Sequence, residues 1–566
     1  MIANGRPPNT LASGILSPTT NNIPTRSASD DIPRLTAGKL LKHSTPNVVA
    51  YAVSPHIAIA LALIIHRTTP MTAHTRFART LLLAFLALVI LPRIANAAGR
   101  PNIIFFLADD QRNDTLGCAG HPIVKTPNID RLAANGTRFT NAFVQHSICW
   151  VSRTTLLTGL TARSFGSPTK PDAARADALN EMCPDELRRA GYRTGFFGKW
   201  HAKMPKGFKP EDHFDNYEAI FRRPYHKPQP DGSTRHESQL IGDRAISFLD
   251  EHDKAKPFYL SLWFNAGHAE DGDKRPGHGH FPWPKVVDGM YDDITVPPPR
   301  LNAVAIYDQQ PQFLKDSINR ERFFWRWDTA EKYQINMRAY FRMLSGIDHV
   351  VGRVMSKLDS LGLHDNTIIV YSGDNGYYMG DRGFAGKWSH YEQSLRVPMI
   401  IRDPRVDSTA KKQVIDSMAL NLDLPATFLD WAGTKIPESY QGRSLKMFVN
   451  GSHQLKNIDW RSDFFCEHVT LAPHITWEGV RNERYVYARY FDQKPVCEFV
   501  HDLQTDPDQL KNLANSPGHK QVVEELRARC DALVTKYGGP LAPIEQRSKR
   551  RKKAKPKAKP KAKTKA

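Results

Sequence analysis

Cysteine is scarce in this chain, with six residues among 566. So few cysteines cannot form the disulfide framework of a small secreted scaffold, and that class of protein is excluded. One of the six, Cys149, is assigned chemistry below, which leaves five and therefore at least one unpaired within the chain. The pair that we expect to form a disulfide bond is Cys466 with Cys497.

The main body of the chain lacks a strong charge of either sign, although the whole sequence has a net charge of +20. Twelve Lys or Arg and no acid lie from Arg547 to Lys565, and residues 1–97 hold nine basic against two acidic side chains. Residues 98–546 are left with about +1. An enzyme of nucleic acids would carry its basic patch on the folded domain, so we expect no specific nucleic-acid partner.

Long apolar runs are also missing. Ile57–Ile65 and Thr80–Pro92 are both short for a spanning helix of ~20 residues, so we expect no stable membrane anchor, although an anchor is the alternative interpretation. From Met71 a basic segment, the second apolar run and the small-residue site Ala95-Asn96-Ala97 form the pattern of a signal peptide. We therefore expect translation to start at Met71, cleavage after Ala97, and a periplasmic or secreted protein.

Two apolar runs end at polar pairs. Residues 102–108 stop at Asp109-Asp110, and residues 367–373 stop at Asp374-Asn375. Such runs predict strands buried on both faces, and ligands bind at the carboxyl edge of open α/β sheets. Carboxylate and amide oxygens suit a hard cation, so these four residues predict a calcium site, with magnesium as the alternative.

The rest of the chain predicts an α/β sandwich. Further strands are expected at 193–197 and 257–264, a helix at 330–361, and a long loop at 267–311. After residue 450 the pattern changes to strands at 480–488 and 497–503 and a helix at 520–536, which indicates a small α+β domain. We expect a leader at 1–97, a catalytic domain at 98–450, the small domain at 451–540 and a disordered basic tail at 541–566, which could contact polyanions.

The segment from Ser147 to Gly159, SICWVSRTTLLTG, carries the most specific signal. It resembles the signature of type I sulfatases, in which the cysteine of a Cys-x-Pro-Ser-Arg core is oxidised to formylglycine. The Asp-Asp-Gln at 109–111 and the segment 125–133 are also similar to that family, and the resemblance covers residues 100–514. One departure is Val151, which stands where the family usually has Pro or Ala and bears on how efficiently Cys149 is oxidised.

The resemblance implies an alkaline phosphatase-like fold: a large central mixed sheet sandwiched by helices, with a smaller α+β C-terminal domain. It implies a sulfuric ester hydrolase that uses calcium and a formylglycine made from Cys149 by a formylglycine-generating or anaerobic maturation enzyme. A hydrated aldehyde has two hydroxyls, one to attack sulfur and one to expel the sulfate afterwards. Cys149 itself joins Asp109, Asp110, Asp374 and Asn375 in the expected metal site.

The resemblance also assigns roles to six other residues. Lys199 and His201, in Lys-Trp-His, bind the sulfate and hold the hydrate, and Arg153 orients that hydrate. His268 is the leaving-group acid, although the chain has His-Ala-Glu where the family usually has His-x-Pro. Lys387 contacts a sulfate oxygen and the bridging oxygen, and His390 is an alternative acid.

The sequence indicates a class of substrate but no individual compound. The segments at 374–378 and 391–392 are similar to sulfatases of carbohydrate sulfates, including N-acetylglucosamine-6-sulfatases, and an arylsulfatase-like activity is included. Four aromatic residues near the site could stack on sugars or pack in the core: Trp150, Tyr377, Tyr378 and Trp388. Two other functions remain as alternatives, a phosphate or phosphonate monoester hydrolase of the same superfamily and an inactive protein that binds sulfated glycans.

Overall fold

A computed structural model of the protein describes residues 99–166, 174–272, 279–407, 412–452, 458–470 and 475–542. The predictions for the leader, its signal peptide and nearly all of the basic tail lie outside these residues. Among the described residues, no helix is both long and apolar enough to cross a lipid bilayer.

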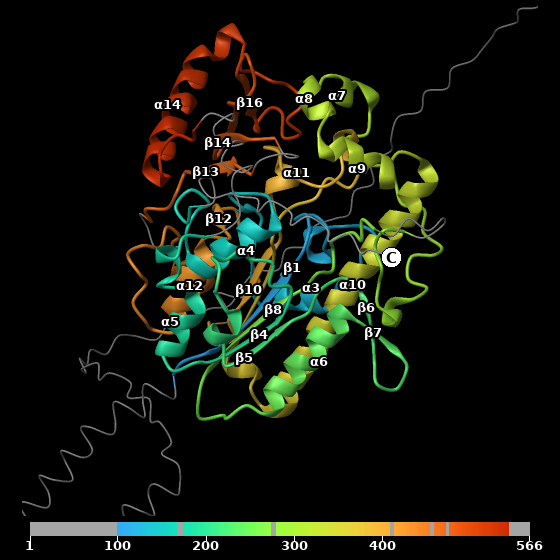
Figure 1. Ribbon diagram of the computed structural model, residues 1–566, viewed down its shortest axis with the longest axis vertical. Helices are drawn as coiled ribbons and strands as arrows, with labels where there is room; N and C mark the ends of the chain where they lie inside the picture. The colour runs from blue at the N-terminus through green and yellow to red at the C-terminus, as the bar shows by residue number, and fades with distance from the viewer. Residues whose placement is uncertain are drawn as a thin grey trace, which may run out of the picture. The chain divides into compact units, whose positions relative to one another are not determined.

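A mixed sheet of eight strands lies at the centre, in the order β11-β2-β10-β9-β1-β8-β4-β5 (Figure 1). Its strands are β1 (Asn102–Ala108), β2 (Thr137–Phe139), β4 (Arg193–Gly198), β5 (Asn216–Ala219), β8 (Phe258–Trp263), β9 (Thr367–Gly373), β10 (Met399–Arg402) and β11 (Gln413–Ile415). Strand β1 is parallel to both its neighbours, β8 and β9, whereas β10 is antiparallel to β9 and β2. Two small pairs complete the sheets, β3 (Ala142–Phe143) with β12 (Ala419–Leu420) and β6 (His226–Pro228) with β7 (Thr234–His236).

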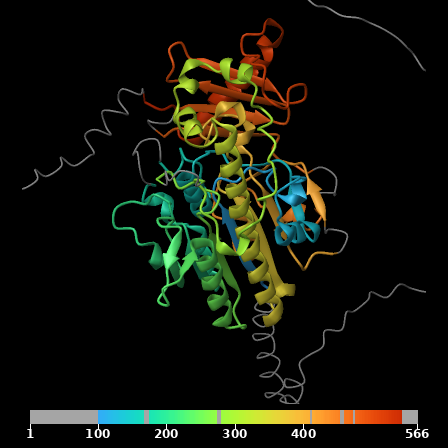
Figure 2. The same ribbon diagram turned by 90° about the vertical axis from the view of Figure 1, so that its right-hand side faces the viewer.

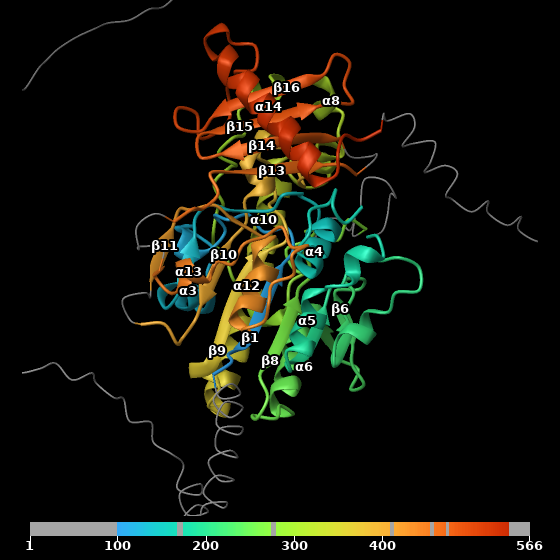
Figure 3. The same ribbon diagram turned by 90° about the vertical axis from the view of Figure 1, so that its left-hand side faces the viewer.

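Both faces of the sheet are covered, and β1 shows why. Its even-numbered residues belong to one hydrophobic core and its odd-numbered residues to another, because successive side chains in a strand point to opposite faces. The first core includes helices α3 (Pro127–Ala134), α6 (Glu237–Asp250) and α10 (Ala330–Leu361), seen in Figure 2. The second includes α4 (Cys149–Thr158), α5 (Cys183–Arg189) and α12 (Asp423–Trp431), seen in Figure 3. The fold is the predicted α/β sandwich.

A second sheet follows in the C-terminal part. It is antiparallel, with consecutive strands β13 (Asp463–His468), β14 (Trp477–Asn482), β15 (Tyr485–Tyr490) and β16 (Cys497–Asp502). Helix α14 (Lys520–Tyr537) packs on one face through a shared apolar cluster. The other face packs against Phe143, Tyr391 and their neighbours in the large α/β part. Short helices fill the connections: α7 (Val304–Asp308), α8 (Gln312–Lys315), α9 (Ile318–Arg326), α11 (Glu392–Leu395) and α13 (Lys446–Val449).

Three sequence predictions need correction. The single strand expected at 480–488 is a hairpin, because Asn482 Oδ1 accepts from the backbone N–H of Arg484 at 2.9 Å and turns the chain. The loop expected at 267–311 contains the short helix α7. All six cysteines lie in the described residues and are free.

The disulfide prediction fails for a topological reason. Cys466 lies in β13 and Cys497 in β16, the two outer strands of the second sheet. Strands in a sheet are spaced ~4.8 Å apart, so two intervening strands separate these cysteines by roughly 14 Å. A disulfide bond requires Cα atoms less than ~7 Å apart.

Candidate active site

The polar pairs that follow β1 and β9 meet at one edge of the sheet. The two strands are parallel neighbours with Ala108 opposite Gly373, so Asp109 and Asp374 emerge side by side. Asp109, Asp110, Asp374 and Asn375 are all buried, each 2% exposed or less. Asn375 Nδ2 donates to Asp110 Oδ1 at 2.6 Å, and the Asp110 backbone N–H donates to Asp374 Oδ1 at 3.3 Å.

Two oxygen atoms of this group lack a hydrogen-bond partner in the described part of the chain. They are Asp109 Oδ1 and Asn375 Oδ1, both fully buried. A buried acceptor without a partner costs free energy, and such atoms are suited to coordinate a cation. Ligand atoms of Asp109, Cys149 and Asp374 lie within 4.8 Å of one another. The donor set therefore fits a metal ion.

The pKa values of the two strand-end aspartates are driven apart. Burial would raise the pKa of Asp109, but the Lys199 ammonium and other nearby cations hold it well below its usual range. Burial, and then the negative charge of Asp109, raise the pKa of Asp374 well above its usual range. The two carboxylates thus compete for positive charge, and a bound cation would allow both to ionise.

Cys149 is the first residue of α4. Its N-cap, Ile148, has no side-chain acceptor, so the first backbone N–H groups of the helix receive no side-chain cap. Helix N-termini favour negative charge, which suits a site for an anion or an attacking oxygen. Val151 is the third residue of the same helix, is fully buried, and donates its backbone N–H to Ile148 O at 3.1 Å.

Arg153 follows Cys149 by four residues and shares its helix face. Its side chain is fully buried, with Nε donating to Asp374 Oδ2 at 2.8 Å and Nη1 donating to the Lys199 carbonyl oxygen at 2.7 Å. Nη2 donates to the Phe264 carbonyl oxygen at 3.1 Å. The guanidinium therefore links the ends of β9, β4 and β8.

Two lysines supply further positive charge. Lys199 forms an ion pair with Asp109, and Lys387 forms one with Asp110. Both lysines are buried. Burial lowers the pKa of Lys387, but Asp110 and the other acidic groups nearby together outweigh burial, so the net shift is upward and the side chain stays charged.

His201 is exposed, unlike the other predicted site residues. Surrounding protein atoms, followed by the Lys199 ammonium, nevertheless lower its pKa to about 2, so the ring is neutral at physiological pH. Its backbone φ is 44°, and Asp110 and Trp388 also have positive φ, at 48° and 83°. Positive φ in such residues costs about 1–3 kcal/mol and is concentrated at functional sites.

His268 lies after β8 on a loop that requires glycine. Gly267 has φ of 91°, and a Cβ there would lie 1.8 Å from the Asp109 carbonyl oxygen. His268 Nδ1 is 2.7 Å from the Ala269 carbonyl oxygen, which can only accept, so Nδ1 carries the proton. Nε2 then accepts from Arg222 Nη1 at 3.4 Å and lies 3.9 Å from Asp110 Oδ2. Burial and then Arg222 lower the pKa of His268 well below its usual range.

Three supporting residues carry no sequence signal that could have identified them. Arg222 contacts His268, and Tyr225 OH donates to the Asn265 carbonyl oxygen at 3.1 Å. Glu237 accepts from the backbone N–H groups of Asn265 and Ala266 at 3.3 and 3.0 Å, and burial raises its pKa to about 7. All three support the loop that carries His268.

His390 and the four aromatic residues have other surroundings. Both ring nitrogens of His390 are engaged, by Tyr490 OH at 2.8 Å and by His501 Nε2 at 3.3 Å, so the structure disfavours it as an alternative acid. Trp150, Tyr377, Tyr378 and Trp388 are each 6% exposed or less and belong to hydrophobic clusters. Core packing, rather than sugar stacking, accounts for them.

The remaining predicted residues come together from six places in the chain, and this arrangement can be compared with known proteins. A family model described as Sulfatase matches residues 101–434, and one described as N-sulphoglucosamine sulphohydrolase, C-terminal, matches residues 380–536. The chain belongs to the sulfatase family. It is thus a hydrolase of the predicted family.

Relatives of this sulfatase match it over most of their own length. It is 28% identical to an N-acetylglucosamine-6-O-sulfatase of Bacteroides thetaiotaomicron, over 75% of this chain and 85% of that protein. A solved structure in complex with D-glucosamine-2-N,6-O-disulfate has a TM-score of 0.64 at 24% identity, covering 77% of this chain and 98% of that one. A phosphonate monoester hydrolase of Agrobacterium radiobacter has the same TM-score at 23% identity, covering 77% and 96%. The two structures show the shared fold.

Proposed function

We propose that this sulfatase hydrolyses sulfate esters of carbohydrates with a formylglycine made from Cys149 and a bound calcium ion. The observation that supports it is the convergence of Cys149 with Asp109 and Asp374 at the N-terminus of α4, within 4.8 Å. The oxidised residue would supply a hydrated aldehyde, with one hydroxyl to attack sulfur and another to expel the sulfate.

The charges of the site support a divalent cation. Three carboxylates, Asp109, Asp110 and Asp374, face three cationic side chains, Arg153, Lys199 and Lys387. With all three carboxylates ionised these charges balance, so a divalent cation held by the carboxylates and Asn375 would leave the cluster positive. An anionic sulfate ester would offset that charge, and magnesium is the alternative to calcium.

The residues of the chain divide the remaining tasks. Lys199 and Lys387 bind sulfate oxygens, Arg153 orients the group at position 149, and neutral His201 accepts a proton or a hydrogen bond from it. His268 protonates the leaving oxygen through Nε2. Because that nitrogen is unprotonated in the free protein, His268 must take up a proton before or with the substrate.

Because the proposed reaction requires protonated His268, kcat/KM should depend on pH. Since the pKa of His268 is lowered, the protonated fraction increases toward acid pH, and kcat/KM should increase with it until a group needed as a base is protonated. A His268→Gln variant should lose both rate and this acid-side increase. An unchanged profile in that variant would assign the acid role elsewhere.

A sulfated carbohydrate is the proposed substrate class. It follows from the likeness to the N-acetylglucosamine-6-O-sulfatase, which extends over three quarters of this chain. A panel of sulfated monosaccharides and polysaccharides, with free sulfate as the readout, would identify the sugar and the sulfated position.

A phosphoryl hydrolase is the second candidate function, because the phosphonate monoester hydrolase shares the fold as closely as the structure solved with D-glucosamine-2-N,6-O-disulfate does. Sulfate and phosphate are both tetrahedral anions, so the geometry accommodates either. The deciding experiment measures kcat/KM on nitrophenyl sulfate, nitrophenyl phosphate and a phenylphosphonate monoester with one preparation. We expect sulfate to be preferred; a preference for either phosphorus ester would replace the proposal.

Maturation of Cys149 must be established in the same preparation. The intact mass of the peptide containing Cys149, after coexpression with a formylglycine-generating enzyme, reports the aldehyde directly. We expect conversion despite Val151. An unmodified thiol with no turnover would instead support the third function, an inactive protein that binds sulfated glycans.

A pair of lysine variants tests the binding roles. Lys199→Ala should lower kcat/KM on nitrophenyl sulfate by roughly 10²–10³, the usual cost of one lost charge-stabilising group. Lys209→Ala is the matched control, because Lys209 is exposed and lies ten residues further along the chain. If the two variants have equal kcat/KM, the proposed role of Lys199 in binding the sulfate is wrong.

The proposed location is the periplasm or the exterior of the cell. The support is the signal-peptide pattern from Met71 to Ala97. N-terminal sequencing of the mature protein should begin at Ala98. A mature protein that begins upstream of Met71, or that stays in the cytoplasmic fraction, would contradict it.

A further inference from the structure

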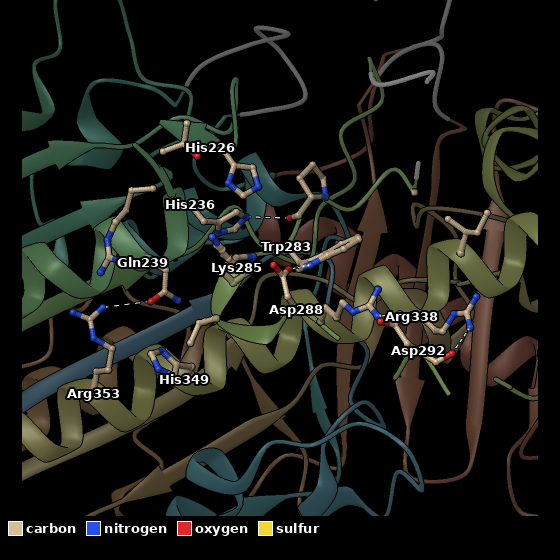
Figure 4. A pocket seen from close by; sticks show the side chains of 18 residues that line it. His226, His236, Gln239, Trp283, Lys285, Asp288, Asp292, Arg338, His349 and Arg353 are labelled. Carbon is tan, nitrogen blue, oxygen red and sulfur yellow. Dashed lines mark hydrogen bonds and ion pairs between the residues drawn. The ribbon is translucent and has the colours of Figure 1, made fainter. Parts of the chain in front are cut away.

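A cavity of about 730 Å³ lies apart from the candidate active site. Its walls come from the β6–β7 hairpin, the start of α6, residues 279–292 and one face of α10 (Figure 4). No residue assigned to the active site lines it. The volume falls within the range of small-molecule sites, so the cavity is large enough for more than an ion.

The cavity follows one face of a helix. Ile335, Arg338, Arg342, His349 and Arg353 line it, and their spacings of three, four and seven place them on one face of α10. At 1.5 Å per residue they extend over ~27 Å. Figure 4 shows Arg338, His349 and Arg353 spaced along this helix. Such a length suits an extended polymer better than a single small molecule.

Positive charge dominates the lining. Arg235, Lys285, Arg338, Arg342 and Arg353 line the cavity, against only two carboxylates, Asp288 and Asp292. The guanidinium groups of Arg235 and Arg353 both bind Asp243, which lies behind the lining.

Two of these cations keep their charge available. Arg338 donates to the Asp292 backbone carbonyl oxygen at 3.1 Å, and Lys285 is exposed. Within the described ranges neither forms an ion pair, whereas the Asp292 carboxylate binds Arg342. Unpaired cations in a concave site attract anions more strongly than the same charges on a flat surface.

A tryptophan ring stands in the same cavity. Trp283 is half-buried, its Nε1 donates to Asp288 Oδ1 at 2.7 Å, and the Arg342 guanidinium lies 4.6 Å from its ring centroid. These contacts fix the ring in place. A fixed aromatic ring beside cations combines an apolar surface for a sugar ring with charges for its anionic substituents.

The cavity wall is joined to the loop that carries His268. His236 lines the cavity and its Nε2 donates to the Pro282 carbonyl oxygen at 3.0 Å. The next residue, Glu237, accepts from the backbone N–H groups of Asn265 and Ala266. Two consecutive residues thus connect the cavity to the catalytic loop, so a polymer held here would be held near the reaction.

We propose that this cavity is a second binding site, for an anionic segment of a sulfated polysaccharide. The choice of polyanion rests on the proposed function, since sulfated polymers are the polyanions that a carbohydrate sulfatase meets. Nucleic acid is the other polyanion with matching charge, and the experiment includes it.

The test compares two double charge reversals in the full-length chain. Lys285→Glu with Arg338→Glu changes the cavity, and Lys435→Glu with Lys520→Glu makes the same change in net charge at exposed positions elsewhere. Binding of dextran sulfate, dextran and single-stranded DNA is measured by calorimetry at 0.15 M salt, together with kcat/KM on nitrophenyl sulfate. Melting curves confirm that each variant is folded.

We expect the cavity variant to bind dextran sulfate at least ~10-fold more weakly than the control variant, with unchanged kcat/KM on the small ester. A third variant, Trp283→Ala, should weaken dextran sulfate binding without a change of charge, which separates the cavity from the basic tail. Equal dextran sulfate affinities in the two double variants would overturn the proposal, and so would DNA binding that is as tight and as dependent on Lys285 and Arg338.

The binding measurement does not depend on turnover. If the preparation binds dextran sulfate through the cavity but does not hydrolyse sulfate esters, the second site stands and the proposed function fails. The opposite result, turnover without cavity-dependent binding, retains the function and removes the second site.

Discussion

The candidate active site and the seam beneath the C-terminal sheet are both buried and polar, but they handle charge differently. We define the seam as the contact between the second sheet and the α/β part around His390, His501, Arg163 and Glu467. The active site holds six charged side chains around the ends of β1 and β9. The seam contains neutral rings and one ion-pair group around Arg163.

Histidines in the seam are kept neutral. His390 and His501 stack with their Nε2 atoms 3.3 Å apart, and two charged imidazoles at that distance would repel. Burial lowers both pKa values, that of His501 to about 4. Trp477 Nε1 closes the seam by donating to the Trp388 carbonyl oxygen at 2.8 Å, one residue after Lys387.

Arg163 is the centre of the ion pairs in the seam. Arg163 is bound by Glu467 Oε2 at 2.6 Å and by Glu478, and its Nη1 donates to the Gly539 carbonyl oxygen at 2.6 Å. Among the described residues, Glu467 Oε1 in the seam and both Asp109 Oδ1 and Asn375 Oδ1 in the active site have no hydrogen-bond partner. The unpartnered oxygens of the active site follow two neighbouring strand ends, an arrangement that suits a cation, whereas Glu467 already pairs with Arg163 through its other oxygen.

The largest expected effect is on turnover. Cys149→Ser, produced in a host that matures only cysteine, should lose at least about a thousandfold in kcat, because a serine hydroxyl cannot release sulfate by forming a carbonyl. Its melting temperature should stay close to wild type. Wild-type turnover in this variant would overturn the formylglycine mechanism.

Removing calcium should affect both activity and stability. A metal-free preparation should lose most of its turnover and regain it on addition of calcium. If the ion is present at about 100 times its Kd, its binding adds about 2.7 kcal/mol to the free energy of unfolding. Calorimetry with and without calcium measures this difference in the free energy of unfolding. If exhaustive chelation leaves both the melting temperature and the rate unchanged, the metal assignment is wrong.

In the seam, breaking the ion-pair group should reduce stability and leave chemistry intact. Arg163→Met leaves Glu467 buried without its cation, which costs about 3–5 kcal/mol. Arg529→Met is the control: Arg529 pairs with Asp463 at the surface, where a pair contributes at most ~1 kcal/mol. Urea unfolding compares the two. Equal losses would mean that the buried group does not hold the seam together.

An effect confined to stability at acid pH is expected from His501. Its folded pKa of about 4 lies below the unfolded value of ~6.5, so its contribution is fully present above pH ~6.5 and is lost as pH falls through about 4. The difference amounts to roughly 3 kcal/mol. His501→Gln should flatten the dependence of unfolding free energy between pH 7 and 4, whereas His519→Gln, at the start of α14, should not.

The sequence alone predicts the residues of the site well where these residues follow buried strands. The runs at 102–108 and 367–373 become β1 and β9 with the predicted bounds, because a strand buried on both faces must be apolar throughout. The helix at 330–361 is likewise recovered as α10. The signature from Ser147 to Gly159 identified the family, which the family model then confirmed.

Tertiary structure decided what depends on distant contacts. Arg222 and Glu237 reach the catalytic loop only because α6 and the segment before it fold against β8, and neither lies in a motif. The cavity along α10 combines cations that are widely spaced in the sequence.

The sequence by itself determined the strands, the long helix and the chemical groups at the strand ends, since burial and local periodicity act over a few residues. The three-dimensional fold decided which oxygens lack partners, which histidines are neutral and which cations are unpaired. Those properties depend on the summed electrostatic and desolvation effects of residues that are far apart in the chain, so a local sequence pattern cannot predict them.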